Sequence, residues 1–496
     1  MQRISGFFKC MLIVSVLTLT NTNPCAGDFR VVKKGSDTAG IGFSNQILPA
    51  QPAPTFSLKD MSGTNYELSK LTAHPMIILY FFDAESRPSQ EGFLGLDNLA
   101  RQYKGMDLTV WGITTSAREA TGQFVVHNHP TLPVLLDPGH VSDLYQARMI
   151  LPTICIIGPD LKAIDYFQGG GKTTEIMLVR LAERTLQRKK TLLAKAISDR
   201  IIEKNPDNVK VKALKGYAEI KEGNLLGAEE IFRKVSRETG DGEILGKEGL
   251  SVVYAKRGET EKALKTAAEV TEKAPERSYA HLIKADILYN QNKKDEAEVE
   301  YRKAVENDEA EPYQKATALN QFGRFYANLG KFDQARQLYE HAVMVDPYYI
   351  EATSNKGMTF EKEGNWEKAL GAYQEALNLD SSDTFASVLA RKAQQMIDLQ
   401  NNTEKRRQVD QLVKELSERF RKQQAMPTSQ KDTWTSRPMV ISFVDFQEKG
   451  RLSERDGFSM VLTTQLGEQL NASGRLKVVE RVVLDQLLAG LNLGSS

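Results

Sequence analysis

The middle of the chain repeats itself, and this periodicity limits what the chain can fold into more than any other feature. Five similar strings align on an alanine, at positions 228, 263, 297, 335 and 369, so that successive strings lie 35, 34, 38 and 34 residues apart. An aromatic residue follows four positions later in four of them, at 232, 301, 339 and 373. Such a period predicts pairs of helices that stack on their neighbours, because no single pair can bury its apolar face alone.

The period, with these small and aromatic residues, resembles the tetratricopeptide repeat, and about five repeats fill residues 189–400. The resemblance implies a superhelix whose groove, lined by the first helix of each repeat, binds a protein or peptide. The candidate partner-binding residues are Lys256, Asn320, Arg324, Asn328, Asn355, Met358 and Lys362. The alternative is that these side chains are simply solvated. The step of 38 predicts an insertion at 308–315, and an amphipathic helix at 401–424 is expected to cap the repeats rather than pair with a partner helix.

Residues 46–188, ahead of the repeats, alternate apolar strands with amphipathic helices, which predicts an α/β sandwich. The pieces "APTFSLKDMSGTNYELSKL", "ILYFFDAESRPSQE" and "ILPTICIIGPDLKAI" resemble the thioredoxin-like redoxin group, which includes peroxiredoxin-like and thiol-reductase types. The resemblance implies a Cys-x-x-Cys motif at the start of the helix after "PMIILY", facing a cis-proline. Here Ser86 and Ser89 stand at the two cysteine positions, Pro88 keeps its place, and Pro152 stands at the cis-proline position.

Redox chemistry of this kind requires a thiolate, which a helix N-terminus stabilises by lowering the pKa of a cysteine. A serine hydroxyl stays protonated there, so neither a disulfide cycle nor a peroxidatic reaction can begin at Ser86 or Ser89. Cys155, in the apolar run "TICII", is expected to be a buried core residue. The alternative is a thiol-disulfide oxidoreductase or peroxiredoxin-like enzyme that uses Cys155 or a partner's thiol. A further idea, that the fold grips unfolded polypeptides, requires Pro152 to be exposed.

After a linker at 425–437, residues 438–496 predict a strand, a helix over 454–473, a second strand and a second helix. This string, with "VVERVVLDQLL" at its centre, resembles the N-terminal part of the curli-assembly and flagellar-outer-membrane-protein-like family. The resemblance implies a part in cell-envelope assembly and a sheet with further strands. A two-stranded sheet buries too little to be stable alone. Three alternatives stay open: it docks on the repeats, it completes its sheet with another chain, or the reading frame is truncated.

The first 26 residues have the order of a secretory signal peptide, with positive charges, the apolar run "MLIVSVLTL" and then small residues. A linker at 27–45 follows. We therefore expect an exported protein of the bacterial periplasm or envelope, with a possible membrane-associated partner. A lipoprotein form at Cys25 is not favoured. The formal net charge of +1 gives no reason to expect a nucleic-acid partner.

No cofactor or metal is expected, because neither "GGGKTT" nor "HNHP" completes a phosphate-binding or metal-ligating motif. The sequence thus predicts a multi-domain protein: an α/β thioredoxin-like sandwich, an all-α tetratricopeptide superhelix and a small partial α/β unit. The favoured function is a non-catalytic interaction scaffold with a degenerate redoxin domain. The oligomeric state and the identity of the partner stay open.

Overall fold

The structure is a computed structural model. It describes residues 51–72, 74, 76–102, 109–169, 173–306, 312–404, 453–472, the strands at 439–441 and 476–478, and a few positions between 407 and 418. The chain divides into one unit of Met1–Gln46 and another of Ile47–Ser496, and every described residue belongs to the second. The predicted signal peptide at 1–26, the linkers at 27–45 and 425–437, most of the capping helix and the last helix lie outside the described residues.

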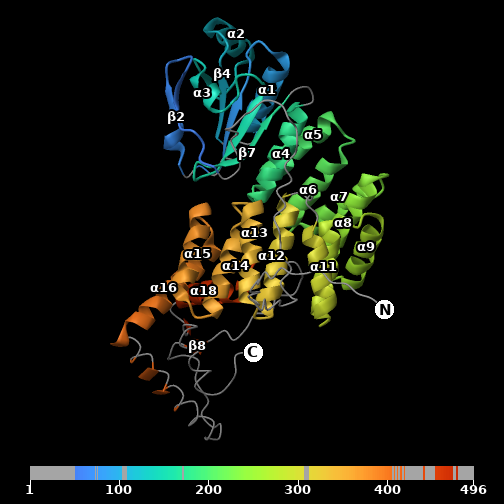
Figure 1. The fold of residues 1–496 in the computed structure, drawn as a ribbon, viewed down its shortest axis with the longest axis vertical. Helices are drawn as coiled ribbons and strands as arrows, with labels where there is room; N and C mark the ends of the chain where they lie inside the picture. The colour runs from blue at the N-terminus through green and yellow to red at the C-terminus, as the bar shows by residue number, and fades with distance from the viewer. Residues whose placement is uncertain are drawn as a thin grey trace, which may run out of the picture. The chain divides into compact units, whose positions relative to one another are not determined.

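The first domain is built on a seven-stranded mixed sheet with the order β2-β1-β5-β4-β3-β6-β7 (Figure 1). Central strand β3 runs parallel to β4 and antiparallel to β6. Every residue of β3 and β6 is buried, which explains why both read as continuous apolar runs rather than as alternating patterns. The strands are β1 (Ser57–Asp60), β2 (Asn65–Glu67), β3 (Ile77–Phe81), β4 (Thr109–Thr114), β5 (Val134–Leu136), β6 (Thr153–Ile157) and β7 (Ala163–Gln168).

Helices cover both faces of this sheet. Ile78 and Tyr80 of β3 belong to one apolar cluster, which also takes in α1 (Arg87–Gln102), α2 (Arg118–Asn128) and α4 (Thr173–Gln187). Leu79 and Phe81 belong to a second cluster, with η1 (Leu68–Leu71) and α3 (His140–Leu144). Because successive side chains of a strand point to opposite faces, β3 is shared between the two layers. The predicted α/β sandwich is confirmed.

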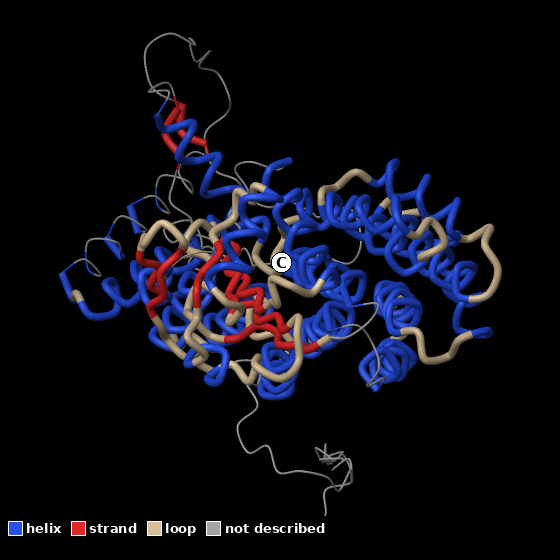
Figure 2. Tube along the Cα trace, turned by 90° about the horizontal axis from the view of Figure 1, so that it is seen from above, coloured by secondary structure: helices blue, strands red, loops and turns tan. Residues whose placement is uncertain are grey.

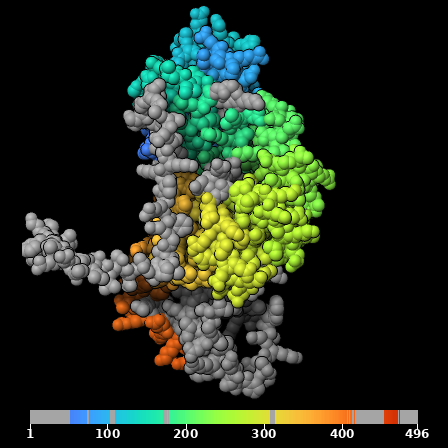
Figure 3. Space-filling view, turned by 45° about the vertical axis from the view of Figure 1, so that its right-hand side comes forward, coloured from blue at the N-terminus to red at the C-terminus, as the bar shows by residue number. Residues whose placement is uncertain are grey.

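Helices then follow one another in pairs, and strands are confined to the sheet and one short pair near the end (Figure 2). Each helix packs on the next. Each even-numbered helix from α4 to α12 also contacts the next even-numbered helix. Figure 3 shows the stacked helices, green to yellow, as one continuous surface. They are α5 (Thr191–Lys204), α6 (Val209–Lys221), α7 (Leu225–Val235), α8 (Asp241–Lys256), α9 (Thr260–Lys273), α10 (Ser278–Asn290), α11 (Lys294–Glu306), α12 (Pro312–Asn328), α13 (Phe332–Val345), α14 (Ile350–Lys362), α15 (Trp366–Leu379) and α16 (Thr384–Asn401).

The aligned alanines explain the period. All five lie on odd-numbered helices from α7 to α15 and are fully buried. In α7, α13 and α15 the aromatic residue four positions later packs on a glycine of the preceding helix, where a side chain has no room. A Cβ added at Gly357 would lie 2.4 Å from the ring of Tyr373, and one at Gly323 would lie 2.5 Å from the ring of Tyr339. Of the predicted insertion at 308–315, residues 308–311 lie outside the described residues and residues 312–315 form the start of α12.

One tyrosine joins the repeats to the sheet domain. The hydroxyl of Tyr348, just before α14, donates a hydrogen bond of 2.6 Å to the carboxylate of Asp160 in the turn between β6 and β7. Its ring packs where Gly158 leaves space, and the guanidinium of Arg188 lies 4.2 Å from the ring centre. The repeats therefore hold the β6–β7 hairpin through a specific polar and aromatic contact.

Near the end of the chain, β8 (Met439–Ile441) pairs in parallel with β9 (Leu476–Val478), and α18 (Phe458–Ala472) lies between them in sequence. The expected helix start at residue 454 is wrong, because α18 begins at Phe458. Gly457 has a φ of +84°, a left-handed conformation that interrupts a helix. Residues 453–457 are therefore non-helical. Val461 of α18 is buried in a cluster with Met358 and Leu389. No helix among the described residues is long and apolar enough to span a membrane.

Candidate functional site

The sheet brings the turn that contains Ser86 close to Pro152, as the predicted redox site requires. Phe81 of β3 lies opposite Thr153 of β6, so the turn after β3 and the segment before β6 leave the sheet at the same end. Ser86 directly precedes α1, and its carbonyl accepts a hydrogen bond of 2.9 Å from the amide of Gln90. The peptide bond between Leu151 and Pro152 is cis. The position that the resemblance implies for a cis-proline therefore has one.

Hydrogen bonds from other groups fix the backbone around the two serines, Ser86 just before α1 and Ser89 in its first turn. Ser89 is buried, and its carbonyl accepts a hydrogen bond of 3.0 Å from the hydroxyl of Tyr80. The carboxylate of Asp83 accepts hydrogen bonds from the Glu85 amide, at 2.9 Å, and from the Ser116 hydroxyl, at 3.0 Å. These bonds fix the turn, and neither serine can supply the thiolate that redox chemistry needs.

Cys155 is a core residue. It is fully buried in the middle of β6, opposite Leu79 and Tyr166 on the neighbouring strands. Burial raises the pKa of the thiol well above its ordinary value, and the charge of Asp165 raises it further. A buried thiol that resists ionisation is a poor nucleophile. Pro152 is also buried, so the exposure that a grip on unfolded polypeptides would need is absent at this residue.

The repeats present a second candidate site, and four of the seven predicted partner-binding residues meet there. Asn320 and Arg324 of α12, and Asn355 and Met358 of α14, contact residues 453–457 of the same chain. We call residues 453–457 the docked segment. We call the residues that hold it the binding face; these are Lys221, Asn320, Gln321, Arg324, Tyr349, Asn355, Met358 and Asp383.

Two asparagines form hydrogen bonds with the main chain of the docked segment. The side-chain amides of Asn320 and Asn355 donate to the carbonyl of Glu454, at 2.9 and 3.0 Å. The Asn355 side-chain oxygen accepts from the amide of Asp456 at 2.9 Å. Asn355 also donates to the Asn320 side-chain oxygen at 2.8 Å, and both asparagines are buried. Because these bonds go to peptide groups, they hold an extended chain whatever its side chains are.

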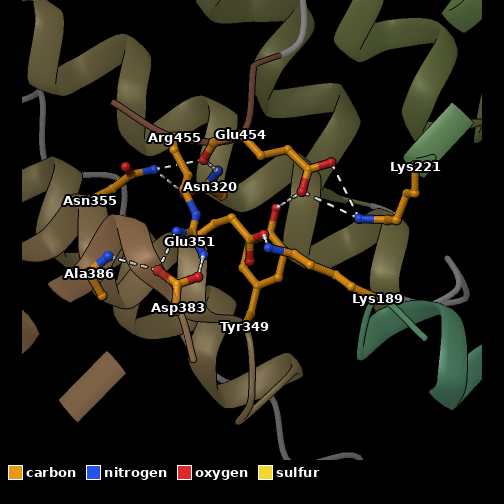
Figure 4. Close-up of polar contacts among 10 residues, drawn as sticks. All are labelled: Lys189, Lys221, Asn320, Tyr349, Glu351, Asn355, Asp383, Ala386, Glu454 and Arg455. Carbon is orange, nitrogen blue, oxygen red and sulfur yellow. Dashed lines mark hydrogen bonds and ion pairs between the residues drawn. The ribbon is translucent and has the colours of Figure 1, made fainter. Parts of the chain in front are cut away.

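Three successive charges of the docked segment meet opposite charges on three helices (Figure 4 shows the first two). The carboxylate of Glu454 lies 3.4 Å from the ammonium of Lys221, at the end of α6. The guanidinium of Arg455 donates two hydrogen bonds, of 2.8 and 2.7 Å, to the carboxylate of Asp383, at the start of α16. Arg324 of α12 pairs with Asp456 at 2.8 Å. Two-point contact between Arg455 and Asp383 is the strongest geometry for such a pair.

Burial and charge act in opposite directions on these groups. Burial would raise the pKa of Asp383, but the hydrogen bonds and charge of Arg455 lower it below its ordinary value. Burial would lower the pKa of Lys221, but the charges of Glu454 and Glu351 raise it above its ordinary value. Charge–charge attraction therefore exceeds desolvation at the binding face, and both groups stay charged at neutral pH.

Glu351 connects the binding face to the start of the repeats. Its side chain is buried and pairs with Lys189, which lies between α4 and α5 (Figure 4). Burial would raise the pKa of Glu351, but the charges of Lys189, Arg455 and Lys221 lower it. One carboxylate thus responds to cations from two places in the repeats and from the docked segment.

The other three predicted residues lie away from these bonds. Lys256 lines a small cavity of about 30 Å³ beside Glu454, together with Tyr279 and Thr317. Asn328 forms a hydrogen bond with Tyr289, and Lys362 is exposed at the end of α14. The sequence reasoning missed Lys221, Gln321, Tyr349 and Asp383. Lys221 is the last residue of α6, and Asp383 directly precedes α16.

Among the described residues, no three or more His, Cys, Asp or Glu side chains are placed to hold a metal ion.

Family models match three parts of the chain. The model of the AhpC/TSA family matches residues 49–166, a tetratricopeptide repeat-like domain matches 180–321, and the N-terminal TPR repeats region of Psidin matches 251–433. The uncharacterized protein ycf37 of Guillardia theta is 32% identical over 72 residues, which is 14% of this chain and 40% of that protein. The chain thus matches about two fifths of the length of this curated relative.

Solved structures resemble the first domain. A peroxidoxin, BcpB of Mycobacterium tuberculosis, is 22% identical with a TM-score of 0.23, and the match covers 25% of this chain and 86% of that one. A putative thiol:disulfide interchange protein, DsbE of Chlorobium tepidum, is 20% identical with a TM-score of 0.25, and the match covers 27% and 94%. The chain therefore combines a thioredoxin-like domain that matches the AhpC/TSA family with tetratricopeptide repeats.

Proposed function

We propose that this chain is a non-catalytic interaction scaffold whose repeats bind an extended peptide segment on the binding face. The proposal rests on Asn320 of α12 and Asn355 of α14, whose side chains form hydrogen bonds with main-chain groups of the docked segment. Main-chain hydrogen bonds supply affinity for an extended chain, while neighbouring side chains select its sequence. Lys221, Arg324 and Asp383 surround these bonds and are the selecting groups.

The thioredoxin-like domain acts in this proposal as a binding module without redox activity. Ser86 and Ser89 occupy the start of α1, where the resemblance implies cysteines, and the thiol of Cys155 is buried in the sheet. Tyr348 holds the domain against the repeats through Asp160, so both parts present their surfaces together. No geometry around Cys155 favours the alternative of a thiol enzyme.

Peptide binding tests the scaffold. We expect the full chain to bind extended peptides from an array, and the double change Asn320→Ala/Asn355→Ala to abolish binding. Lys362→Ala is the matched control, because Lys362 is exposed on the same helix as Asn355 and outside the binding face. An array on which the double variant binds as many peptides as the wild-type chain does contradicts the proposal.

A redox assay tests the second half of the proposal. The wild-type chain should neither reduce insulin disulfides nor consume peroxide, and a Ser86→Cys/Ser89→Cys variant should gain disulfide-reducing activity. Turnover by the wild type that disappears in Cys155→Ala would make the chain an enzyme.

We further propose that the protein acts in the cell envelope after export. The order of residues 1–26 and the resemblance of 438–496 to envelope-assembly proteins support this location. Fractionation of cells that produce the tagged chain, with and without residues 1–26, tests it. Retention of the full chain in the cytoplasm would contradict it.

A further inference from the structure

We infer that the docked segment is an internal ligand of the binding face, and that a partner must carry the same acidic–Arg–acidic–Gly chemistry and displace it. The inference rests on the proposed function and adds the class of ligand and its regulation. Its basis is that residues 453–457 already occupy the bonds that an extended partner segment would use.

The order of charges defines the ligand. Glu454, Arg455 and Asp456 each meet an opposite charge, on Lys221, Asp383 and Arg324. The side chains of the three segment residues are only 22%, 12% and 14% exposed. A segment with the opposite sign of charge at each of these three positions would place like charges together in a partly desolvated setting, which binding sites use to reject wrong partners.

Gly457 adds a fourth requirement. Its φ of +84° is a conformation that residues with a side chain rarely adopt. A Cβ at this position would also lie 3.2 Å from the Met358 side chain, which packs against the segment. Glycine therefore allows the chain to turn directly from the extended segment into α18 on the surface of α14 and α16.

Helix α18 strengthens the internal ligand. Val461 is buried against Met358 and Leu389, and Arg391 of α16 pairs with Glu468 at 2.7 Å. A short free peptide lacks these helix contacts. The segment is also tethered to the repeats, since α16 ends at Asn401 in the same chain. Docking within one chain is intramolecular, so a peptide in solution competes at a disadvantage.

The test uses a fluorescent peptide of residues 451–459 and the full chain, with binding followed by anisotropy. The wild-type chain should bind the peptide weakly, because its own segment occupies the face. The change Arg455→Glu in the chain places a carboxylate against Asp383 and Glu351 and should release the segment, so that the peptide binds at least about tenfold more tightly. Lys362→Glu, a charge reversal at an exposed residue outside the binding face, is the matched control, and it should bind the peptide no more than about twofold more tightly than the wild type does.

A charge swap makes the test specific. Adding Asp383→Arg to Arg455→Glu restores an opposite pair within the chain and opposes the arginine of the peptide, so tight binding should disappear. Hydrogen exchange gives a readout that does not depend on the peptide. The amide of Asp456, which donates to Asn355, should exchange slowly in the wild type and rapidly in Arg455→Glu.

Two outcomes would overturn the inference. One is a folded Arg455→Glu chain that binds the peptide no more tightly than the wild type. The other is rapid exchange of the Asp456 amide in the wild type. If unrelated array peptides still bind through Asn320 and Asn355, the proposed function survives and only the internal ligand is lost. If no peptide binds any variant, both fail.

Discussion

The side-chain amide of Asn355 donates a hydrogen bond of 3.0 Å to the main-chain carbonyl of Glu454, which lies 99 positions later in the sequence. Through this bond and its partner from Asn320, a repeat array holds a segment of its own chain as it would hold a ligand. The same segment approaches Glu351, whose other contact, Lys189, follows the thioredoxin-like domain. The repeats, from their first residue onward, and the docked segment therefore share one polar network.

Replacing Asn355 with alanine should weaken docking of residues 453–457. The change removes one of the two donors to the Glu454 carbonyl, which keeps its bond from Asn320, and it removes the side-chain acceptor of the Asp456 amide. Such losses cost about 1–3 kcal/mol each. Hydrogen exchange of residues 453–460 measures the effect, with Lys362→Ala as the control. Unchanged protection in Asn355→Ala would show that the asparagine does not hold the segment.

Cys155 should be unreactive in the native protein. The thiol is fully buried, and burial raises its pKa, so little thiolate forms and reagents have no access. In a chain with Cys10→Ser and Cys25→Ser, a thiol reagent should label Cys155 at least about 100 times more slowly in buffer than in denaturant, because labelling requires opening of the sheet domain. Rapid native labelling would restore the alternative of a thiol enzyme.

Gly357→Ala should destabilise the repeats, whereas Gly371→Ala should not. A Cβ at Gly357 would lie 2.4 Å from the ring of Tyr373, and overpacking of this kind costs about 1–3 kcal/mol. Gly371 is an exposed position of α15, and a Cβ added there would meet no neighbouring side chain within 4 Å. Alanine should therefore stabilise the helix by up to about 1 kcal/mol. Denaturant unfolding compares the two variants. Equal midpoints would contradict the role of the glycine–aromatic contact.

The sequence predicts the architecture well because periodic burial is local. Alternating strands and helices indicate the sandwich, and the aligned alanines indicate the helix pairs, since each depends on neighbours within about 40 residues. The rule that first helices line the groove also finds Asn320 and Asn355. It adds Asn328 and Lys362, which form no hydrogen bond with the docked segment, because membership of a first helix alone does not show which side chains meet a ligand.

The occupant of the binding face could not be predicted in the same way. Residues 454–457 look like the polar start of the helix that follows, and only the left-handed conformation of Gly457 separates them from it. Their partners lie on α6, α12, α14 and the start of α16, far away in sequence. No local pattern encodes contacts between such distant residues. The charge order of Glu454, Arg455 and Asp456 becomes informative only after Lys221, Asp383 and Arg324 are placed around it.

Asp383→Asn should reduce stability at neutral pH, and its effect should fade in acid. Asparagine keeps the helix cap, because its side-chain oxygen can still accept the hydrogen bond that Asp383 takes from the Ala386 amide at 2.7 Å. The variant loses the charge that pairs with Arg455 and one of the two oxygens that accept hydrogen bonds from it, which we expect to cost about 2 kcal/mol. Since the folded-state pKa of Asp383 lies below its ordinary value of 3.8, the charged form stabilises the fold.

This contribution is complete above pH 3.8 and is lost as the pH falls through the lowered value. The difference in unfolding free energy between wild type and Asp383→Asn should therefore be constant near neutral pH and shrink towards zero below about pH 4. Denaturant unfolding at a series of pH values measures it, and Asp398→Asn, at the end of the same helix and outside the binding face, is the control. A difference that grows in acid would mean that Arg455 does not stabilise the charged form of Asp383, and the docked segment would lose one of its three charge contacts.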